Sequence, residues 1–112
     1  QVQQVRFVPG DVTDLTALTA ALREHRITHV IHLAGLQVPT CRANPILGAT
    51  VNVLGTLAVF EAVKELGGQV QRVVYASSAA VFGGPDKYPA GPQPDDAPLV
   101  PSTHYGVFKC CN

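Results

Sequence analysis

The sequence alternates between short runs of β-branched and aromatic residues and longer stretches in which apolar residues recur every three or four positions. The short runs predict β-strands. The second of them is almost continuously apolar, which is typical of a parallel strand that is covered on both faces. The three predicted strands are residues 5–8, 28–33 and 72–76.

The longer stretches predict helices. Asp14 can cap the first helix, which ends near residue 26, and a long second helix is expected at 45–66 because Gly67 and Gly68 follow it. Gly55 lies inside this second helix, where glycine costs about 1 kcal/mol relative to alanine, so we expect another part of the backbone to pass close to it.

The C-terminal part of the sequence predicts a loop followed by one more helix. Residues 84–101 are rich in proline, glycine and aspartate, which favour turns and irregular structure. Ser102 or Thr103 can then cap a helix that begins just before Tyr105.

The order strand, helix, strand, helix, strand, loop, helix predicts an α/β fold, namely part of a doubly wound parallel sheet of the Rossmann type, holding about its third to fifth strands. Ligands of such sheets bind outside the carboxyl ends of the strands. Small or polar residues follow each predicted strand at that edge: Gly10-Asp11, Ala34-Gly35 and Ser77-Ser78.

Composition narrows the possible classes of function. The chain has 112 residues, with 8 Lys plus Arg and 8 Asp plus Glu, so it carries no basic surface for nucleic acid or for a membrane. No apolar run approaches the roughly 20 residues that span a bilayer, and the N-terminus lacks the pattern of a signal peptide. Cys41, Cys110 and Cys111 have no metal-binding spacing and predict reduced thiols in a cytoplasmic protein.

Tyr105 and Lys109 are four residues apart and share one face of the last predicted helix. A phenol normally keeps its proton up to about pH 10, but a nearby ammonium stabilises the phenolate. A tyrosine in this setting can take the proton of a substrate hydroxyl, and a strand-end serine such as Ser78 can hold the same oxygen. This pattern predicts acid–base chemistry beside a hydride acceptor.

These motifs together resemble the extended short-chain dehydrogenase/reductase family, in particular the NAD-dependent epimerase/dehydratase branch that includes UDP-glucose 4-epimerase. The motifs fall in the family's order along the whole chain. They are Gly10-Asp11-Val12-Thr13-Asp14, His32-Leu33-Ala34-Gly35, Val51-Asn52-Val53-Leu54-Gly55-Thr56, Ala76-Ser77-Ser78-Ala79-Ala80-Val81-Phe82-Gly83 and Tyr105-Gly106-Val107-Phe108-Lys109.

The resemblance implies a role for each matching residue. Ser78, Tyr105 and Lys109 would be catalytic, with Tyr105 as the acid/base and Lys109 bound to the nicotinamide ribose. Phe82 stands where the family usually has tyrosine. The implied site for NAD, with NADP as the alternative, consists of Asp11, Val12, Leu33, Ala34, Gly35, Asn52, Ser77, Tyr105 and Lys109.

The resemblance also implies that residues 1–112 are a partial NAD(P)-binding domain. The sequence holds neither a glycine-rich phosphate-binding turn nor a substrate-binding domain, so we expect exposed strand edges and an inactive isolated piece. The implied parent is a homodimer that acts on a nucleotide sugar by hydride transfer.

Other readings stay open at this point. The protein could be a reductase or dehydrogenase of a different hydroxyl or carbonyl substrate, or a non-catalytic NAD(P)-sensing protein. His29 and His32 would face opposite sides of a strand, which argues against a metal site. His104 could face the substrate loop, and Asp86, Asp95 and Asp96 fit a solvated loop better than a catalytic carboxylate pair.

Overall fold

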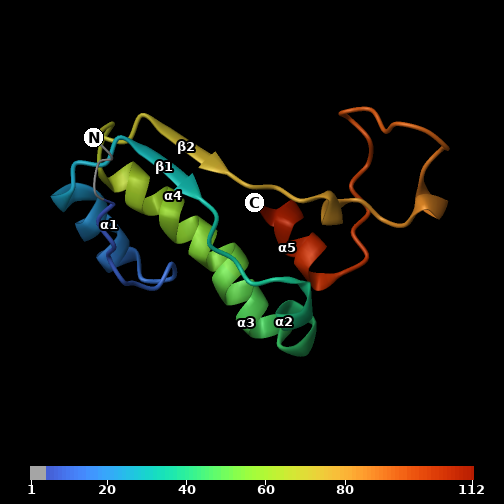
Figure 1. The fold of residues 1–112 in the computed structure, drawn as a ribbon, viewed down its shortest axis with the longest axis horizontal. Coiled ribbons are helices and arrows are strands. Elements are labelled where there is room, and N and C mark those ends of the chain that lie inside the picture. The colour runs from blue at the N-terminus through green and yellow to red at the C-terminus, as the bar shows by residue number, and fades with distance from the viewer. Residues whose placement is uncertain (1–4) are drawn as a thin grey trace.

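The computed structural model describes residues 5–112 and contains a pair of parallel strands that lie side by side above the long helix in the view of Figure 1. β1 (His29–His32) pairs with β2 (Arg72–Tyr75), with His32 opposite Tyr75 at the carboxyl end. Two of the predicted strands are therefore confirmed. Their adjacency and their parallel direction place this region in the α/β Rossmann-like class.

The remaining predicted strand, which is the first along the sequence at residues 5–8, is wrong. The segment has no strand partner within residues 5–112, and Val5 and Phe7 are 93% and 85% exposed. An apolar hollow of about 380 Å³ is lined by residues 8–12 on one side and by residues 30–34 on the other. A run of β-branched residues becomes a strand only when a neighbouring strand lies within hydrogen-bonding distance, about 4.8 Å.

The first predicted helix is confirmed as α1 (Leu15–Glu24), which lies alongside the long central helix (Figure 1). Asp14 is its N-cap, because its carboxylate accepts a hydrogen bond from the backbone N–H of Ala17 at 2.9 Å. The chain leaves α1 through Arg26, which has a positive φ of 51°. The helix is thus positioned to cover one side of the crossover between the two strands.

The crossover contains three helices and one irregular turn. α2 (Val38–Ala43) was not predicted, because six residues are too few to show a helical period. α3 (Pro45–Ala49) and α4 (Gly55–Glu65) confirm the long helix, but a π-helical turn (Thr50–Leu54) joins them. The two glycines after α4 have φ values of 56° and 98°, and they end the helix as expected.

Gly55 is explained by a side chain rather than by a passing backbone. A Cβ at this position would lie 2.7 Å from Cγ1 of Val12. The expectation of a close backbone is therefore wrong in detail. The glycine still allows the segment around Val12 to rest directly on the helix.

The expectation that no apolar stretch approaches the length needed to span a bilayer also needs correction. The continuous helix Pro45–Glu65 has 21 residues and is long and apolar enough to cross a membrane by length and composition. Here 39% of its most apolar stretch is buried against the rest of the chain, including Val59 and Ala62. A helix that covers a parallel sheet has the same apolar composition, since its sheet-facing side is buried.

The C-terminal part follows the predicted pattern, with one added turn. Residues 84–101 are irregular except for a 3₁₀ turn at Pro85–Lys87. α5 (His104–Cys111) lies near the carboxyl end of β2 (Figure 1), and Thr103 caps it by accepting a hydrogen bond from the N–H of Gly106 at 3.0 Å. The predicted start of the last helix is confirmed.

Candidate functional site

The carboxyl ends of β1 and β2 bring three separate segments of the chain together. Residues 33–37 follow β1, residues 76–81 follow β2, and α5 packs on the second of these segments. Gly106 makes this packing possible, because a Cβ there would collide with the carbonyl oxygen of Ala80 and would lie 2.9 Å from Cβ of Pro101. The start of α5 is thereby fixed next to the turn that follows β2.

Lys109 connects α5 to the end of β2. Its ammonium donates a hydrogen bond to the carbonyl oxygen of Ala76 at 2.7 Å. The same nitrogen lies 4.4 Å from the ring centroid of Tyr75 and 5.8 Å from that of Tyr105. Both distances fall within the roughly 6 Å from a ring centroid at which cation–π contacts are favourable.

Ser78 and Tyr105 belong to the same packed unit. Ser78 Oγ accepts a hydrogen bond from the N–H of Ala80 at 3.1 Å, so the serine hydrogen is left to donate elsewhere. Tyr105 is half-buried, and its hydroxyl makes no hydrogen bond to residues 5–112. The structure brings the predicted catalytic residues to one strand end, while their roles in a reaction stay predictions.

Asn52 shapes the turn that follows β1. It is only 3% exposed, and its Oδ1 accepts from the N–H of Leu36 at 2.6 Å while its Nδ2 donates to the carbonyl oxygen of Leu36 at 2.9 Å. Both ends of the amide are thus used on the chain itself. A Cβ at Gly35 would lie 3.4 Å from Oδ1 of Asn52, so the two residues are neighbours. The predicted direct contact of Asn52 with a cofactor stays a prediction.

The segment before α1 offers a free carboxylate oxygen. Oδ1 of Asp11 accepts hydrogen bonds from both the N–H and the hydroxyl of Thr13, each at 2.8 Å. These bonds lower the pKa of the Asp11 carboxyl, which is exposed. Oδ2 remains an acceptor, which suits the amino group of an adenine.

The available groups fit a dinucleotide. Exposed small residues follow β1, hydroxyl groups follow β2, and the ammonium of Lys109 is bound to the backbone of Ala76 directly after β2. Such a site has donors for ribose and an open backbone for a flat ring. The exposed members of this set at the ends of β1 and β2 are Leu33, Ala34, Gly35 and Ser77.

His32 was not among the predicted site residues, although the structure places its ring 5.5 Å from that of Tyr75, over which Lys109 lies. It is 4% exposed, and its Nε2 lies 2.9 Å from Oγ1 of Thr56 on α4. Burial lowers the pKa of His32, and the positive charge of Lys109 lowers it further. The sequence signal for a buried His32 was the prediction that His29 and His32 face opposite sides of a strand. This prediction is confirmed, since His29 is exposed and His32 is buried.

No group of three His, Cys, Asp or Glu side chains that could hold a metal ion occurs in the described part of the chain. His29 is exposed and bonds Thr28 at 3.0 Å. Asp86 forms an exposed ion pair with Lys87 at 2.9 Å, and Asp95 and Asp96 are exposed. None of these groups lies with the strand-end residues.

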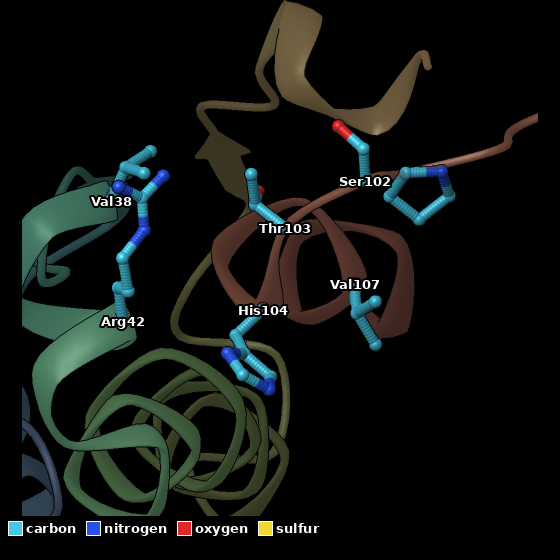
Figure 2. Close-up of a pocket in the computed structure, with 7 residues that line it drawn as sticks. Val38, Arg42, Ser102, Thr103, His104 and Val107 are labelled. Atoms are coloured by element: carbon cyan, nitrogen blue, oxygen red, sulfur yellow. The ribbon is translucent and has the colours of Figure 1, made fainter. Parts of the chain in front are cut away.

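His104 lines a separate hollow of about 410 Å³ between α2 and the start of α5 (Figure 2). Arg42 enters this hollow from α2, and Ser102 and Thr103 line it from the α5 side. The ring of His104 stacks on Phe108 at 6.3 Å between centroids. The expectation that His104 faces the substrate loop stays a prediction.

A parallel pair of strands joined by crossover helices, with a further helix near the carboxyl end of β2, defines a Rossmann-like region. The family model for GDP-mannose 4,6 dehydratase matches residues 1–112, and the chain belongs to this family of NAD-dependent epimerases and dehydratases, within the extended short-chain dehydrogenases/reductases. The resemblance drawn from the motifs is confirmed.

Relatives with two different activities match the same region. UDP-glucose 4-epimerase of Neisseria meningitidis serogroup A is 38% identical over 109 residues, which are 96% of this chain and 31% of that protein. D-erythronate dehydrogenase of Cupriavidus necator is 39% identical over 106 residues, which are 95% of this chain and 31% of that protein. The chain thus spans about a third of the length of the curated relatives it matches.

Solved structures agree with the fold. The UDP-glucose 4-epimerase of Thermus thermophilus in complex with NAD superposes with a TM-score of 0.81 at 33% identity, covering 96% of this chain and 34% of that one. The similarity extends through both strands and all the helices between them. The family and the fold are therefore shown together, while the specific activity is not.

Proposed function

We propose that this chain carries the catalytic residues of an NAD-dependent enzyme that transfers hydride to or from a hydroxyl-bearing carbon of a nucleotide sugar. The observation that supports the proposal most directly is the position of Lys109, held at 2.7 Å from the carbonyl oxygen of Ala76 and facing the ring of Tyr105. A tyrosine beside a fixed ammonium at a strand end is suited to proton transfer at neutral pH.

Each of the three side chains has a separate task in this proposal. Tyr105 takes the proton from the substrate hydroxyl through its free phenolic oxygen. Ser78 donates its remaining hydrogen to the same substrate oxygen, which holds that oxygen in place while its charge changes. Lys109 keeps a positive charge beside the phenol, which stabilises the phenolate as the proton is transferred.

NAD, when bound, supplies the carbon atom that accepts or returns the hydride. The residues that would hold it are those with open polar or small surfaces at the strand ends. Asp11 would bind the adenine through Oδ2, Leu33, Ala34 and Gly35 would contact the phosphates and ribose, and Ser77 and Lys109 would hold the nicotinamide end. NADP is the alternative cofactor, since the part of the fold that selects between them lies outside these residues.

A second candidate function is an NAD-dependent dehydrogenase that acts on another hydroxyl substrate. The D-erythronate dehydrogenase relative supports it, because its identity of 39% is as high as the 38% of the epimerase quoted above. The two candidates differ in net chemistry. An epimerase returns the hydride to its substrate and accumulates no NADH, whereas a dehydrogenase releases NADH with the oxidised product.

Two further expectations belong to the proposal. The resemblance to the family implies a homodimer, and a cytoplasmic location is expected because the cysteines are free and cytoplasmic proteins keep their thiols reduced. A non-catalytic NAD(P) sensor is disfavoured, because Tyr105 and Lys109 are both present and correctly spaced.

The deciding experiment is Tyr105→Phe in the protein at its full natural length. We expect kcat to fall about 10²- to 10⁴-fold, the range that general acid–base groups contribute, with NADH binding nearly unchanged. Tyr88→Phe is the matched control, because it removes a phenol from the loop and not from the strand end. Turnover of Tyr105→Phe near that of the unmodified protein would overturn the proposal.

The two candidate functions are separated with UDP-glucose and UDP-galactose on one side and sugar acids on the other. Interconversion of the two nucleotide sugars without net NADH supports the epimerase. Net NADH formation from a sugar acid, with no change in the nucleotide sugars, supports the dehydrogenase.

A further inference from the structure

The buried titratable residue of β1, His32, takes no part in the proposed reaction, yet it contacts Tyr75, the ring over which the ammonium of Lys109 lies. Only 4% of it is exposed, and the strand places it at the carboxyl end opposite Tyr75. A histidine in such a place needs a hydrogen-bond partner and has one in Thr56. The remaining question is what its other ring atoms contact.

The hydrogen bonds of Thr56 determine which nitrogen of His32 carries the hydrogen. Oγ1 of Thr56 donates its single hydrogen to the carbonyl oxygen of Asn52 at 2.7 Å. The same oxygen can therefore only accept from His32, at 2.9 Å, so Nε2 of His32 is the protonated nitrogen. Any additional proton would have to go to Nδ1.

The imidazole of His32 also contacts the ring of Tyr75, over which the ammonium of Lys109 lies. The centroids of the His32 and Tyr75 rings are 5.5 Å apart and the rings are tilted by 32°. The ammonium of Lys109 lies 4.4 Å from the centroid of the Tyr75 ring. The Tyr75 ring therefore contacts both the imidazole of His32 and the ammonium of Lys109.

A second path of hydrogen bonds leads back to the same ring. Nδ2 of Asn112 donates to the hydroxyl of Tyr75 and to the carbonyl oxygen of Asn52, both at 2.9 Å. Tyr75 is therefore held at its hydroxyl end by Asn112 and on its face by His32. Both supports depend on the backbone of Asn52, which also accepts from Thr56.

The charges around His32 oppose a second cation. The titratable groups that face it are Tyr75 from β2 and Lys109 from α5, while α4 contributes only the neutral Thr56. Asp11 lines the apolar hollow that His32 also reaches, but its carboxylate is hydrogen-bonded to Thr13. In residues 5–112 no carboxylate forms an ion pair with His32.

We propose that His32 is a positioning residue for Lys109: as a neutral imidazole it holds the Tyr75 ring under the ammonium, and a proton on Nδ1 drives the ammonium away from that ring and from the Ala76 carbonyl. This proposal rests on the proposed function, in which Lys109 holds the nicotinamide ribose. Protonation of His32 therefore weakens cofactor binding first, because Lys109 holds the nicotinamide ribose. Its effect on proton transfer by Tyr105 comes second.

The test uses the protein at its full natural length and measures the dissociation constant of NADH by fluorescence from about pH 8 downward to the lowest pH at which the protein stays folded, because burial and the charge of Lys109 lower the pKa of His32 below the ordinary value of a histidine. In the unmodified protein we expect binding to weaken about tenfold as the pH falls, the effect of one pKa unit of coupling. His32→Gln keeps a neutral N–H donor near the position of Nε2 and cannot titrate, so its binding should stay nearly constant with pH.

His29→Gln is the matched control, because His29 is an exposed histidine on the same strand that bonds only Thr28. Its acid profile should equal that of the unmodified protein. His32→Leu removes the donor and should weaken NADH binding at every pH. If His32→Leu does not fold, the glutamine variant decides alone.

The outcomes separate this proposal from the one on which it rests. Equal acid profiles for the unmodified protein and His32→Gln, with normal NADH binding, would overturn the role of His32 and leave the proposed function intact. An altered profile in His32→Gln together with full turnover by Tyr105→Phe would support His32 and overturn the catalytic assignment. No NADH binding at any pH would contradict both.

Discussion

The segments that follow β1 and β2 both end at the candidate site, but they are held in opposite ways. After β1, the buried amide of Asn52 bonds both polar groups of the Leu36 backbone. The thiol of Cys41 adds a bond to the Leu36 carbonyl at 3.4 Å, and burial raises the pKa of this thiol, although a hydrogen bond from Asn52 opposes the shift. This short turn is fixed by side chains from within the fold.

The loop at residues 83–101 after β2 depends largely on one phenol. The hydroxyl of Tyr88 accepts from the N–H of Gly83 at 3.1 Å and donates to the carbonyl oxygen of Pro98 at 2.9 Å. Phe82 packs edge-on against the Tyr88 ring at 5.9 Å. The turn after β1 is therefore held by buried hydrogen bonds, whereas the bonds of Tyr88 that hold the loop after β2 lie closer to solvent.

The largest effect on this comparison is expected from Gly106→Ala, which disrupts the joint between α5 and the turn after β2. The new Cβ would collide with the carbonyl oxygen of Ala80, which is backbone and cannot swing aside. We expect a loss of about 3 kcal/mol in the free energy of unfolding, at the upper end for overpacking, and a large loss of kcat. Denaturant unfolding and turnover measure the two effects.

Gly10→Ala is the matched control, because nothing lies within 4 Å of a Cβ at that position. A Gly106→Ala variant as stable and as active as Gly10→Ala would mean that α5 does not rest on Ala80.

A smaller effect is expected from Asn52→Ala, which tests whether the turn after β1 is held from within. It leaves the N–H of Leu36 without a partner and its carbonyl oxygen with only the thiol of Cys41, so the free energy of unfolding should fall by about 2–3 kcal/mol. NADH binding should weaken as well, since the turn at Ala34 and Gly35 loses its support. Thermal unfolding and NADH titration measure both changes.

Asn44→Ala removes an amide that caps α3 at its exposed end, and it provides the control. Its cost should be about 1 kcal/mol, typical of an N-cap, with NADH binding unchanged. Equal effects of the two alanines on NADH binding would show that Asn52 has no special relation to the turn.

The smallest effect is expected from Tyr88→Phe, which frees the loop after β2. The two hydrogen bonds are lost, but the groups lie near solvent and can bind water, so about 1 kcal/mol or less should be lost. The Michaelis constant for substrate should rise a few-fold, with NADH affinity unchanged. A change in NADH affinity instead would mean that the two segments are coupled.

Local sequence signals were sufficient for much of the fold. Asp14 and Thr103 cap helices as predicted, because a capping side chain bonds backbone groups only three residues away. The exposed–buried alternation of His29 and His32 follows from the geometry of any strand. The ordered motifs were enough to recognise the family, which the match over residues 1–112 confirms.

Other features could not be predicted, because they depend on residues far apart in the chain. The apolar run at residues 5–8 has every local property of a strand and yet has no partner within residues 5–112. The π-helical turn at Thr50–Leu54 shifts the face of the long helix, which no count of apolar spacing would show. Asn52 was predicted as a cofactor residue, and no local signal shows that its amide bonds Leu36, 16 residues away.

By itself, the sequence determined the positions of β1 and β2, the caps of α1 and α5 and the set of motifs that the chain carries, since these depend on neighbours within a few positions. Tertiary structure alone decided that His32, Thr56 and Tyr75 would meet beneath Lys109. The contact between Lys109 and Ala76 joins residues 33 apart, and the bond between His32 and Thr56 joins residues 24 apart. Such contacts form only when the crossover places the helices over the parallel strands, because packing and not local preference brings these side chains together.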